Sequence, residues 1–184
     1  MKKFISLITM IVLTAGLYAQ NEVTKFLGIP VDGTKSAMIQ KLKAKGFTYN
    51  QKEDLLEGEF NGEKVFIAVL TNNNKVWRIA VVEKQNRDEA QIRIRFNNLL
   101  SQFENNSKYV SLESNKMIED DEKIGYGIRL DKKQYAVAFL QKQADGSVNG
   151  NNIVWFTIND RSYDEYSITL FYENGNNQAN GDDL

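Results

Sequence analysis

Residues 33–47 read GTKSAMIQKLKAKGF, and this stretch specifies a helix from its start to its end. Thr34 or Ser36 can cap the first turn, because a side-chain oxygen there accepts a free backbone N–H. Three apolar residues recur at helical spacing on one face: Met38, Ile39 and Leu42. Gly46 in a left-handed conformation ends the helix and turns Phe47 back onto Leu42, as in a Schellman motif.

The residues after this helix predict antiparallel strands. The predicted strands cover residues 55–60, 63–70 and 75–82. Asn61 and Gly62 separate the first two, and this dipeptide is a strong hairpin signal because both residues tolerate the positive φ of a type I′ turn. Residues 71–74 form the next turn.

A second unit follows the same plan. A helix is expected from about Asn86, which can cap it with Glu89 three residues later, to Phe103. Its apolar face is Ile92, Phe96, Leu99, Leu100 and Phe103. Four more strands are predicted over residues 124–130, 134–140, 152–158 and 163–172. The order predicts an α+β fold on an antiparallel sheet, with two main helices and two helix-then-strands units.

The N-terminal residues 1–19 have the pattern of a secretory signal peptide. Lys2 and Lys3 precede the uncharged, mostly apolar residues 4–17, and Ala19 is the small residue before the expected cleavage at Gln20. The apolar stretch is shorter than the roughly 20 residues that cross a bilayer. We therefore expect a periplasmic or secreted protein with no membrane span after cleavage.

These features divide the chain into three parts. We expect a signal peptide over residues 1–19, a single α+β domain over residues 20–172 and a disordered polar tail over residues 173–184, which offers almost nothing to bury. The chain has no cysteine, so its stability must come from a hydrophobic core rather than from disulfides.

Composition excludes several classes of function. The chain contains no histidine and no cysteine, which excludes Ser-His-Asp and Cys-His catalysis and the usual zinc sites. A formal net charge of −1 gives no electrostatic reason to expect nucleic acid as a partner. We expect no enzyme activity, no cofactor and no metal, and no catalytic or binding residue can be assigned.

Residues 145–150 match the first half of a calcium-binding loop, with oxygen ligands at the first, third and fifth positions and glycine at the sixth. Asp145 is the single carboxylate among these ligands, and Phe156 stands where a bidentate Glu is expected. We therefore interpret the segment as an ordinary hairpin turn and expect no calcium binding. The acidic residues 119–122 are interpreted as a solvated loop.

Gly125 and Gly127 alternate with bulky residues in the predicted strand 124–130. With Lys132 and Lys133 as a two-residue turn, this strand pairs with 134–140, leaving one bulky face and one small face. The small face either lies outside the core or admits close approach by a helix, a ligand or a partner backbone.

Aromatic residues in the predicted strands offer a second functional signal. Five of them are Trp77, Trp155, Tyr163, Tyr166 and Tyr172. They form either an aromatic platform for a glycan or a protein, or part of the core, and we favour the core.

The segment of Lys25-Phe26-Leu27-Gly28-Ile29-Pro30-Val31-Asp32-Gly33, with Met38, Leu42 and Lys45-Gly46-Phe47, resembles uncharacterised exported proteins of Bacteroides-type bacteria. The resemblance covers residues 25–47, implies a Gram-negative exported protein and implies no activity. The element order loosely resembles the beta-lactamase inhibitor protein fold and PepSY-like domains, without a shared motif.

The sequence thus favours an exported, non-catalytic module that binds a protein, a peptide or a glycan outside the cytoplasm. The alternative is an extracytoplasmic hydrolase that uses Asp and Glu carboxylates. A deep pocket holding two or more acids would favour the hydrolase, and a shallow sheet surface the binding module.

Overall fold

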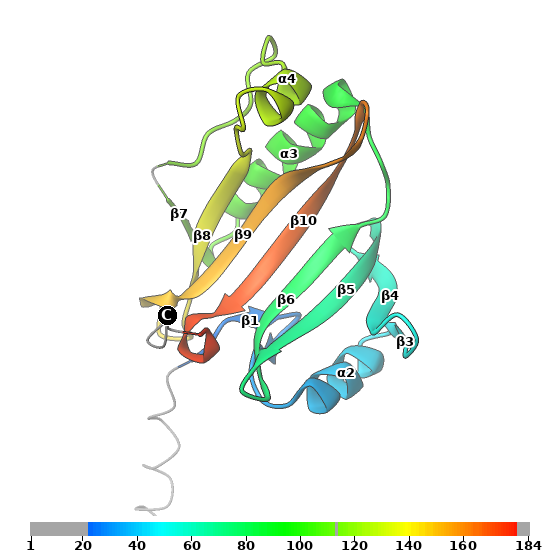
Figure 1. The fold of residues 1–184 in the computed structure, drawn as a ribbon. Coiled ribbons are helices and arrows are strands. Elements are labelled where there is room, and N and C mark those ends of the chain that lie inside the picture. Colours follow the sequence, from blue (N-terminus) through cyan, green and yellow to red (C-terminus); the bar gives the residue numbers. More distant parts are fainter. Residues whose placement is uncertain (1–21, 113, 180–184) are drawn as a thin grey trace, which may run out of the picture.

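The computed structural model describes residues 22–112 and 114–179, so the predicted signal peptide lies outside the described residues. One antiparallel sheet has the strand order β3-β4-β5-β6-β10-β9-β8-β7 (Figure 1). Its strands are β3 (Thr48–Asn50), β4 (Leu55–Phe60), β5 (Glu63–Asn72), β6 (Lys75–Glu83), β7 (Tyr109–Ser111), β8 (Ala136–Lys142), β9 (Val148–Ser162) and β10 (Glu165–Asn174). The other elements are β1 (Lys25–Phe26), β2 (Ile29–Pro30), α2 (Lys35–Ala44), α3 (Glu89–Glu104), α4 (Ile124–Arg129) and the 3-10 helix η1 (Gly175–Asn177).

The predicted α+β class and the two helix-then-strands units are confirmed. Helix α2 precedes β3 to β6, and α3 precedes β7 to β10. The last strands of the two units, β6 and β10, pair antiparallel at the centre, with Val81 opposite Leu170. From each edge of the sheet to its centre, the four strands of one unit therefore follow one another in sequence order. Within the described residues, no helix is long and apolar enough to cross a membrane.

Both long helices cover the same face of the sheet. Helix α2 buries Met38, Ile39 and Leu42, and α3 buries Ile92, Phe96, Leu99, Leu100 and Phe103. These side chains join one core cluster with strand residues such as Ile67, Val81 and Leu170. Figure 1 views the sheet from its other side, with α3 behind the strands.

The predicted end of the first helix is confirmed in detail. Thr34 caps the start by accepting the Ala37 N–H. Gly46 has φ +98°, its N–H donates to the carbonyl of Lys43, and the Phe47 N–H donates to the carbonyl of Leu42. Both hydrogen bonds of a Schellman motif are therefore present, and Phe47 is 5% exposed.

The predicted hairpin at Asn61 and Gly62 is also confirmed, because both residues have positive φ, 51° and 77°. The following turn is tighter than residues 71–74: β5 continues through Asn72, and only Asn73 and Asn74 have positive φ. The short strands β1, β2, β3 and β7 were missed because two or three residues show no periodicity.

The predicted strand 124–130 is wrong, because residues 124–129 form helix α4. The Glu89 carboxylate accepts the backbone N–H groups of Ile124 and Gly125 at 3.0 Å, which favours a helix start there. A Cβ on Gly125 would collide with the Tyr166 hydroxyl, and one on Gly127 with that of Tyr135. The glycines therefore serve close approach, as one interpretation expected, but from a helix.

The loss of this strand also removes the predicted hairpin through Lys132 and Lys133. Strand β8 pairs instead with β7 and β9, and it begins at Ala136 rather than at residue 134. At the start of α3, Asp88 is the cap in place of Asn86, since its carboxylate accepts the Gln91 N–H at 2.8 Å.

The predicted disordered tail is wrong over the part that the structure describes. Glu173 and Asn174 belong to β10, and the Asn174 side chain is buried and donates to the Val31 carbonyl at 2.9 Å. Asn177 in η1 donates to the Val76 carbonyl. These amides satisfy backbone carbonyls of Val31, which follows β2, and of Val76 in β6, and composition alone does not reveal such pairings. Residues 180–184 lie outside the described residues.

Candidate functional site: the open face of the sheet

The central strands carry a second face that points away from the helices, because successive side chains alternate across a sheet. The register places its residues in three rows across β5, β6, β10, β9 and β8. The rows are Leu70, Arg78, Glu173, Ile153, Leu140; Ala68, Ala80, Phe171, Trp155, Ala138; and Phe66, Val82, Thr169, Thr157, Ala136. We call these residues, together with Trp77, the open face.

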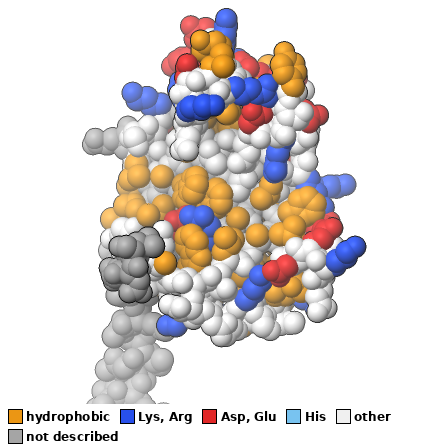
Figure 2. All heavy atoms as spheres, in the orientation of Figure 1, with side chains coloured by type: hydrophobic (Ala, Val, Ile, Leu, Met, Phe, Trp, Pro, Cys, Tyr) orange, Lys and Arg blue, Asp and Glu red, His pale blue; other side chains and the backbone are white. Residues whose placement is uncertain are grey.

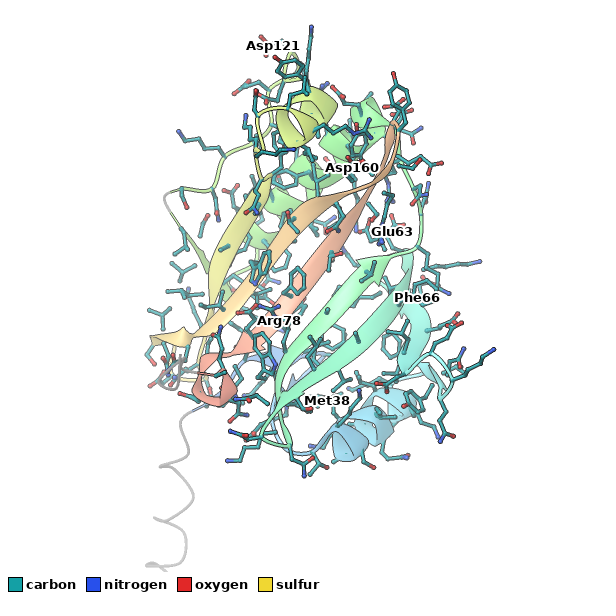
Figure 3. All side chains as sticks on the ribbon, viewed as in Figure 1. Met38, Glu63, Phe66, Arg78, Asp121 and Asp160 are labelled. Atoms are coloured by element: carbon teal, nitrogen blue, oxygen red, sulfur yellow. The ribbon has the colours of Figure 1, made fainter. Side chains whose placement is uncertain are left out.

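The open face is mainly apolar. Figure 2 shows hydrophobic side chains gathered across the middle of the molecule around a small group of charged atoms. In the same view, Figure 3 labels Arg78 near this centre and Phe66 on β5. Exposed apolar patches on soluble proteins commonly mark sites of interaction.

A β-bulge aims Trp77 and Arg78 at the same face. The register shifts between Leu70 and Thr71 of β5, so that Leu70 pairs with Arg78 and Thr71 pairs with Val76. Trp77 is the extra residue between these pairs, and a bulge of this kind re-aims the side chains of the bulged strand. The Arg78 guanidinium consequently lies 4.1 Å from the centroid of the Trp77 ring.

The centre of the open face is a preorganised aromatic and ionic cluster. Trp155 and Phe171 stack with ring centroids 4.1 Å apart and an interplanar angle of 21°. Glu173 accepts the Trp155 Nε1–H at 2.7 Å and pairs with Arg78 at 2.5 Å. Arg78 also lies 5.0 Å from the Phe171 ring. Because the two charges neutralise each other in place, the cluster presents flat aromatic surface without an unpaired buried charge.

The five aromatic residues considered in the sequence lie in three different places in the structure. Tyr166 and Tyr172 are core residues, as favoured, and burial raises the pKa of Tyr172 well above its ordinary value. Trp77 and Trp155 are half-buried on the open face, so the core interpretation is wrong for both. Tyr163 is 86% exposed in the β9–β10 turn, where Arg129 lies over its ring.

The remaining sequence candidates are turns and loops. Residues 145–147 form the β8–β9 turn, where Asp145 accepts both the Ser147 N–H and hydroxyl. Gly150 belongs to strand β9. In the acidic segment 119–122 the first three residues are exposed, while Lys133 and Tyr135 donate to Glu122 and lower its pKa. Among the described residues, no group of three or more acidic side chains is arranged to hold a metal ion.

Two neighbouring carboxylates, Glu83 and Glu63, are engaged by arginines. Glu83 is buried at the end of β6, where Arg87 and Arg95 both donate to it, and Glu63 accepts from Arg87. Glycosidase chemistry needs two carboxylates that reach the substrate. Here guanidinium groups bond both oxygens of Glu83 and one oxygen of Glu63.

Comparison with protein-family models, with curated proteins and with solved structures gives no match for this chain. The resemblance around residues 25–47 therefore stays a prediction. The site rests on its own geometry, and the sequence signal that could have located it is the pair Trp77-Arg78 within a strand.

Proposed function

We propose that this protein is an exported, non-catalytic binding module whose open face docks onto a folded protein outside the cytoplasm. The observation that supports the proposal is the aromatic and aliphatic surface of the open face, which no helix of the described chain covers. Trp and Arg dominate the energetic centres of protein interfaces, and Trp77, Arg78 and Trp155 lie together here.

A folded protein suits this surface better than a glycan or an extended peptide. Sugar rings stack on free aromatic faces, but Trp155 is already stacked on Phe171 and Arg78 lies over Trp77. An extended peptide adds to the edge of a sheet, whereas the open face is centred on β6, β10 and β9, away from the edge strands β3 and β7. A broad, nearly flat apolar surface favours a complementary apolar surface on a folded partner.

A bulky charge on the open face, next to its central aromatic cluster, tests the proposal. Ala138 is half-buried opposite Trp155, so Ala138→Arg obstructs docking without removing a core side chain. Ala37→Arg, at an exposed position on α2, is the matched control. The tagged mature protein is cross-linked in the envelope of the producing cell, and the captured protein is purified and titrated against each variant.

We expect the parent and Ala37→Arg to bind equally and Ala138→Arg to bind at least about tenfold more weakly, with unchanged melting temperatures. Equal binding by Ala138→Arg would show that the open face is not the interface. Recovery of no protein above background would count against the binding module itself.

A further inference from the structure

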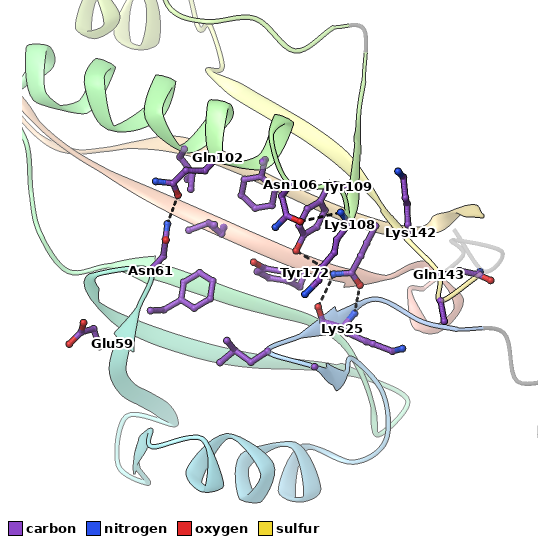
Figure 4. Close-up of a pocket in the computed structure, with 18 residues that line it drawn as sticks. Lys25, Glu59, Asn61, Gln102, Asn106, Lys108, Tyr109, Lys142, Gln143 and Tyr172 are labelled. Carbon is purple, nitrogen blue, oxygen red and sulfur yellow. Dashed lines mark hydrogen bonds between the residues drawn. The ribbon is translucent and has the colours of Figure 1, made fainter. Parts of the chain in front are cut away.

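A groove lies on the helix-covered side of the sheet, opposite the open face. It has a volume of about 810 Å³ and runs between α3, the β1–β2 hairpin and the β4–β5 turn (Figure 4). This volume lies in the range of small-molecule sites. The apolar surface of its floor, the hydrogen-bonding groups of its amides and the charge of its lysines decide which class of ligand it fits.

The floor of the groove is apolar. Leu99 and Phe103 from α3, Leu170 and Tyr172 from β10, and the half-buried Phe60 from β4 line it. The Tyr172 hydroxyl is neutral at neutral pH, as tyrosine ordinarily is, and burial raises its pKa further, so these floor side chains carry no charge. A ligand in the groove therefore places an apolar body against these side chains.

Leu27 adds a strained apolar residue to this lining. It lies in the β1–β2 turn with φ 51°, a left-handed conformation that costs free energy in a bulky residue, and it is 38% exposed. The fold gains no core packing from an exposed leucine at this position. The two-residue turn requires positive φ at both Leu27 and Gly28, and a leucine in place of the usual Asn or Gly puts an apolar side chain in the groove lining.

The amide side chains of the groove are already engaged by the protein. Asn61 donates to Gln102 at 2.9 Å across one end of the groove, and the Asn106 side chain accepts the backbone N–H of Lys108. Gln141 bonds both the N–H and the carbonyl of Lys25. These bonds hold the amides in place at the rim of the groove, and the aliphatic and phenyl side chains of the floor offer no hydrogen-bonding group to the hydroxyl groups of a sugar.

Three lysines gather at the other end of the groove. Figure 4 shows Lys25, Lys108 and Lys142 at the end opposite Asn61 and Gln102. The backbone fixes this arrangement, because Lys142 N–H donates to the Lys108 carbonyl at 2.8 Å and Gln141 joins Lys25 to β8. Lys25 pairs with Glu22, whereas Lys108 and Lys142 make no ion pair within the described residues. This end therefore offers uncompensated positive charge.

We propose that this groove binds an amphipathic carboxylate of the fatty-acid type as a monomer. Its hydrocarbon chain lies on the floor beside Leu27, and its carboxylate lies at the end of the groove that carries Lys108 and Lys142. The proposal is independent of docking at the open face, because the two sites lie on opposite faces of the sheet.

Isothermal titration with dodecanoate, below its micelle concentration, tests the charge requirement. We expect one site per chain for dodecanoate and no saturable binding of dodecyltrimethylammonium, which has the same chain and the opposite charge. The double variant Lys108→Glu/Lys142→Glu should weaken binding at least about tenfold. The matched double variant Lys52→Glu/Lys75→Glu changes two exposed lysines outside the groove lining and should bind as the parent does.

Leu27→Gly separates binding from stability. Glycine adopts positive φ freely, so the variant should keep the melting temperature of the parent while it binds dodecanoate more weakly. Equal binding of the cationic amphiphile, or full binding by Lys108→Glu/Lys142→Glu, would overturn the proposal. Sedimentation of the parent with phosphatidylglycerol vesicles, without binding of monomeric dodecanoate, would assign the lysines to a lipid surface and would overturn it as well.

Discussion

Substituting Glu83 by Gln should destabilise the fold by about 3–5 kcal/mol, because it breaks a buried ionic network between the two units. The Glu83 carboxylate accepts from Arg87 at 2.8 Å and from the Nε and Nη2 of Arg95 at 2.9 and 2.6 Å. Arg87 also donates to Glu63 at 2.6 Å. Glu63 and Glu83 belong to the strands of the first unit, and Arg95 belongs to α3 of the second.

The magnitude follows from burial and from the number of donors. The Glu83 side chain is 1% exposed and that of Arg87 is 7% exposed, so water cannot replace a lost partner. Glutamine keeps the shape but offers one acceptor oxygen, and its NH₂ group faces guanidinium donors. Two buried guanidinium groups then share the single carboxylate of Glu63. A loss of about 3–5 kcal/mol is a fifth or more of a typical total of about 5–15 kcal/mol.

Urea denaturation of the protein without residues 1–19 measures this loss. With a slope of about 1–3 kcal/mol per molar urea, the midpoint should fall by roughly 1–5 M. Lys84→Gln is the control, because it breaks a neighbouring but more exposed pair with Glu57 and should cost less than about 1 kcal/mol. A Glu83→Gln midpoint as close to the parent as that of Lys84→Gln would refute the reasoning.

Three further predictions concern single positions. Gly46→Ala should lower the free energy of unfolding in urea by about 1 kcal/mol, because there is open space for a Cβ at this position but the residue has a left-handed φ. Gly46→Asn should cost less. A Gly46→Ala protein as stable as the parent would contradict the Schellman stop. Phe47→Ala should cost about 3 kcal/mol or more in the same assay, through lost burial and a cavity, and a loss under about 1 kcal/mol would exclude tight packing. Arg129 lowers the pKa of Asp160 through two hydrogen bonds, so the stability that this pair contributes is present above the unfolded pKa of about 3.9 and disappears as the pH falls through the folded pKa. Melting temperatures of the parent and Asp160→Asn should therefore differ near pH 6 and converge as the pH falls below the folded pKa, and a constant difference would exclude the linkage.

Local chemistry explains which elements could be predicted from the sequence. The first helix carries its own cap at Thr34 and its own stop at Gly46, and both act within a few residues of the chain. The Asn61-Gly62 turn is equally local, since its type depends on the φ preferences of two residues. Local signals such as these caps and turns predict the structure correctly because no tertiary contact competes with them.

Tertiary contacts explain the principal error. Residues 124–130 alternate as a strand does, yet Glu89, far away in the chain, bonds the first two N–H groups of a helix there. Two glycines then let this helix approach Tyr135 and Tyr166 more closely than any other residue would. Neither partner can be identified from the segment itself, so its periodicity misleads.

The alternation of side chains in the strands does not predict the open face, but the numbers of strands and helices do. Strand β10 is buried at nearly every position on both faces, so periodicity does not tell which side the helices cover. Neighbouring strands lie about 4.8 Å apart, and eight of them make a sheet roughly 35 Å wide. Two helices of about 10 Å diameter cannot cover even one face of such a sheet completely, and they cannot cover both. A sequence that predicts a large sheet and only two long helices therefore predicts a bare face, and the position of Trp77, Arg78 and Trp155 on it is what favours its use in binding.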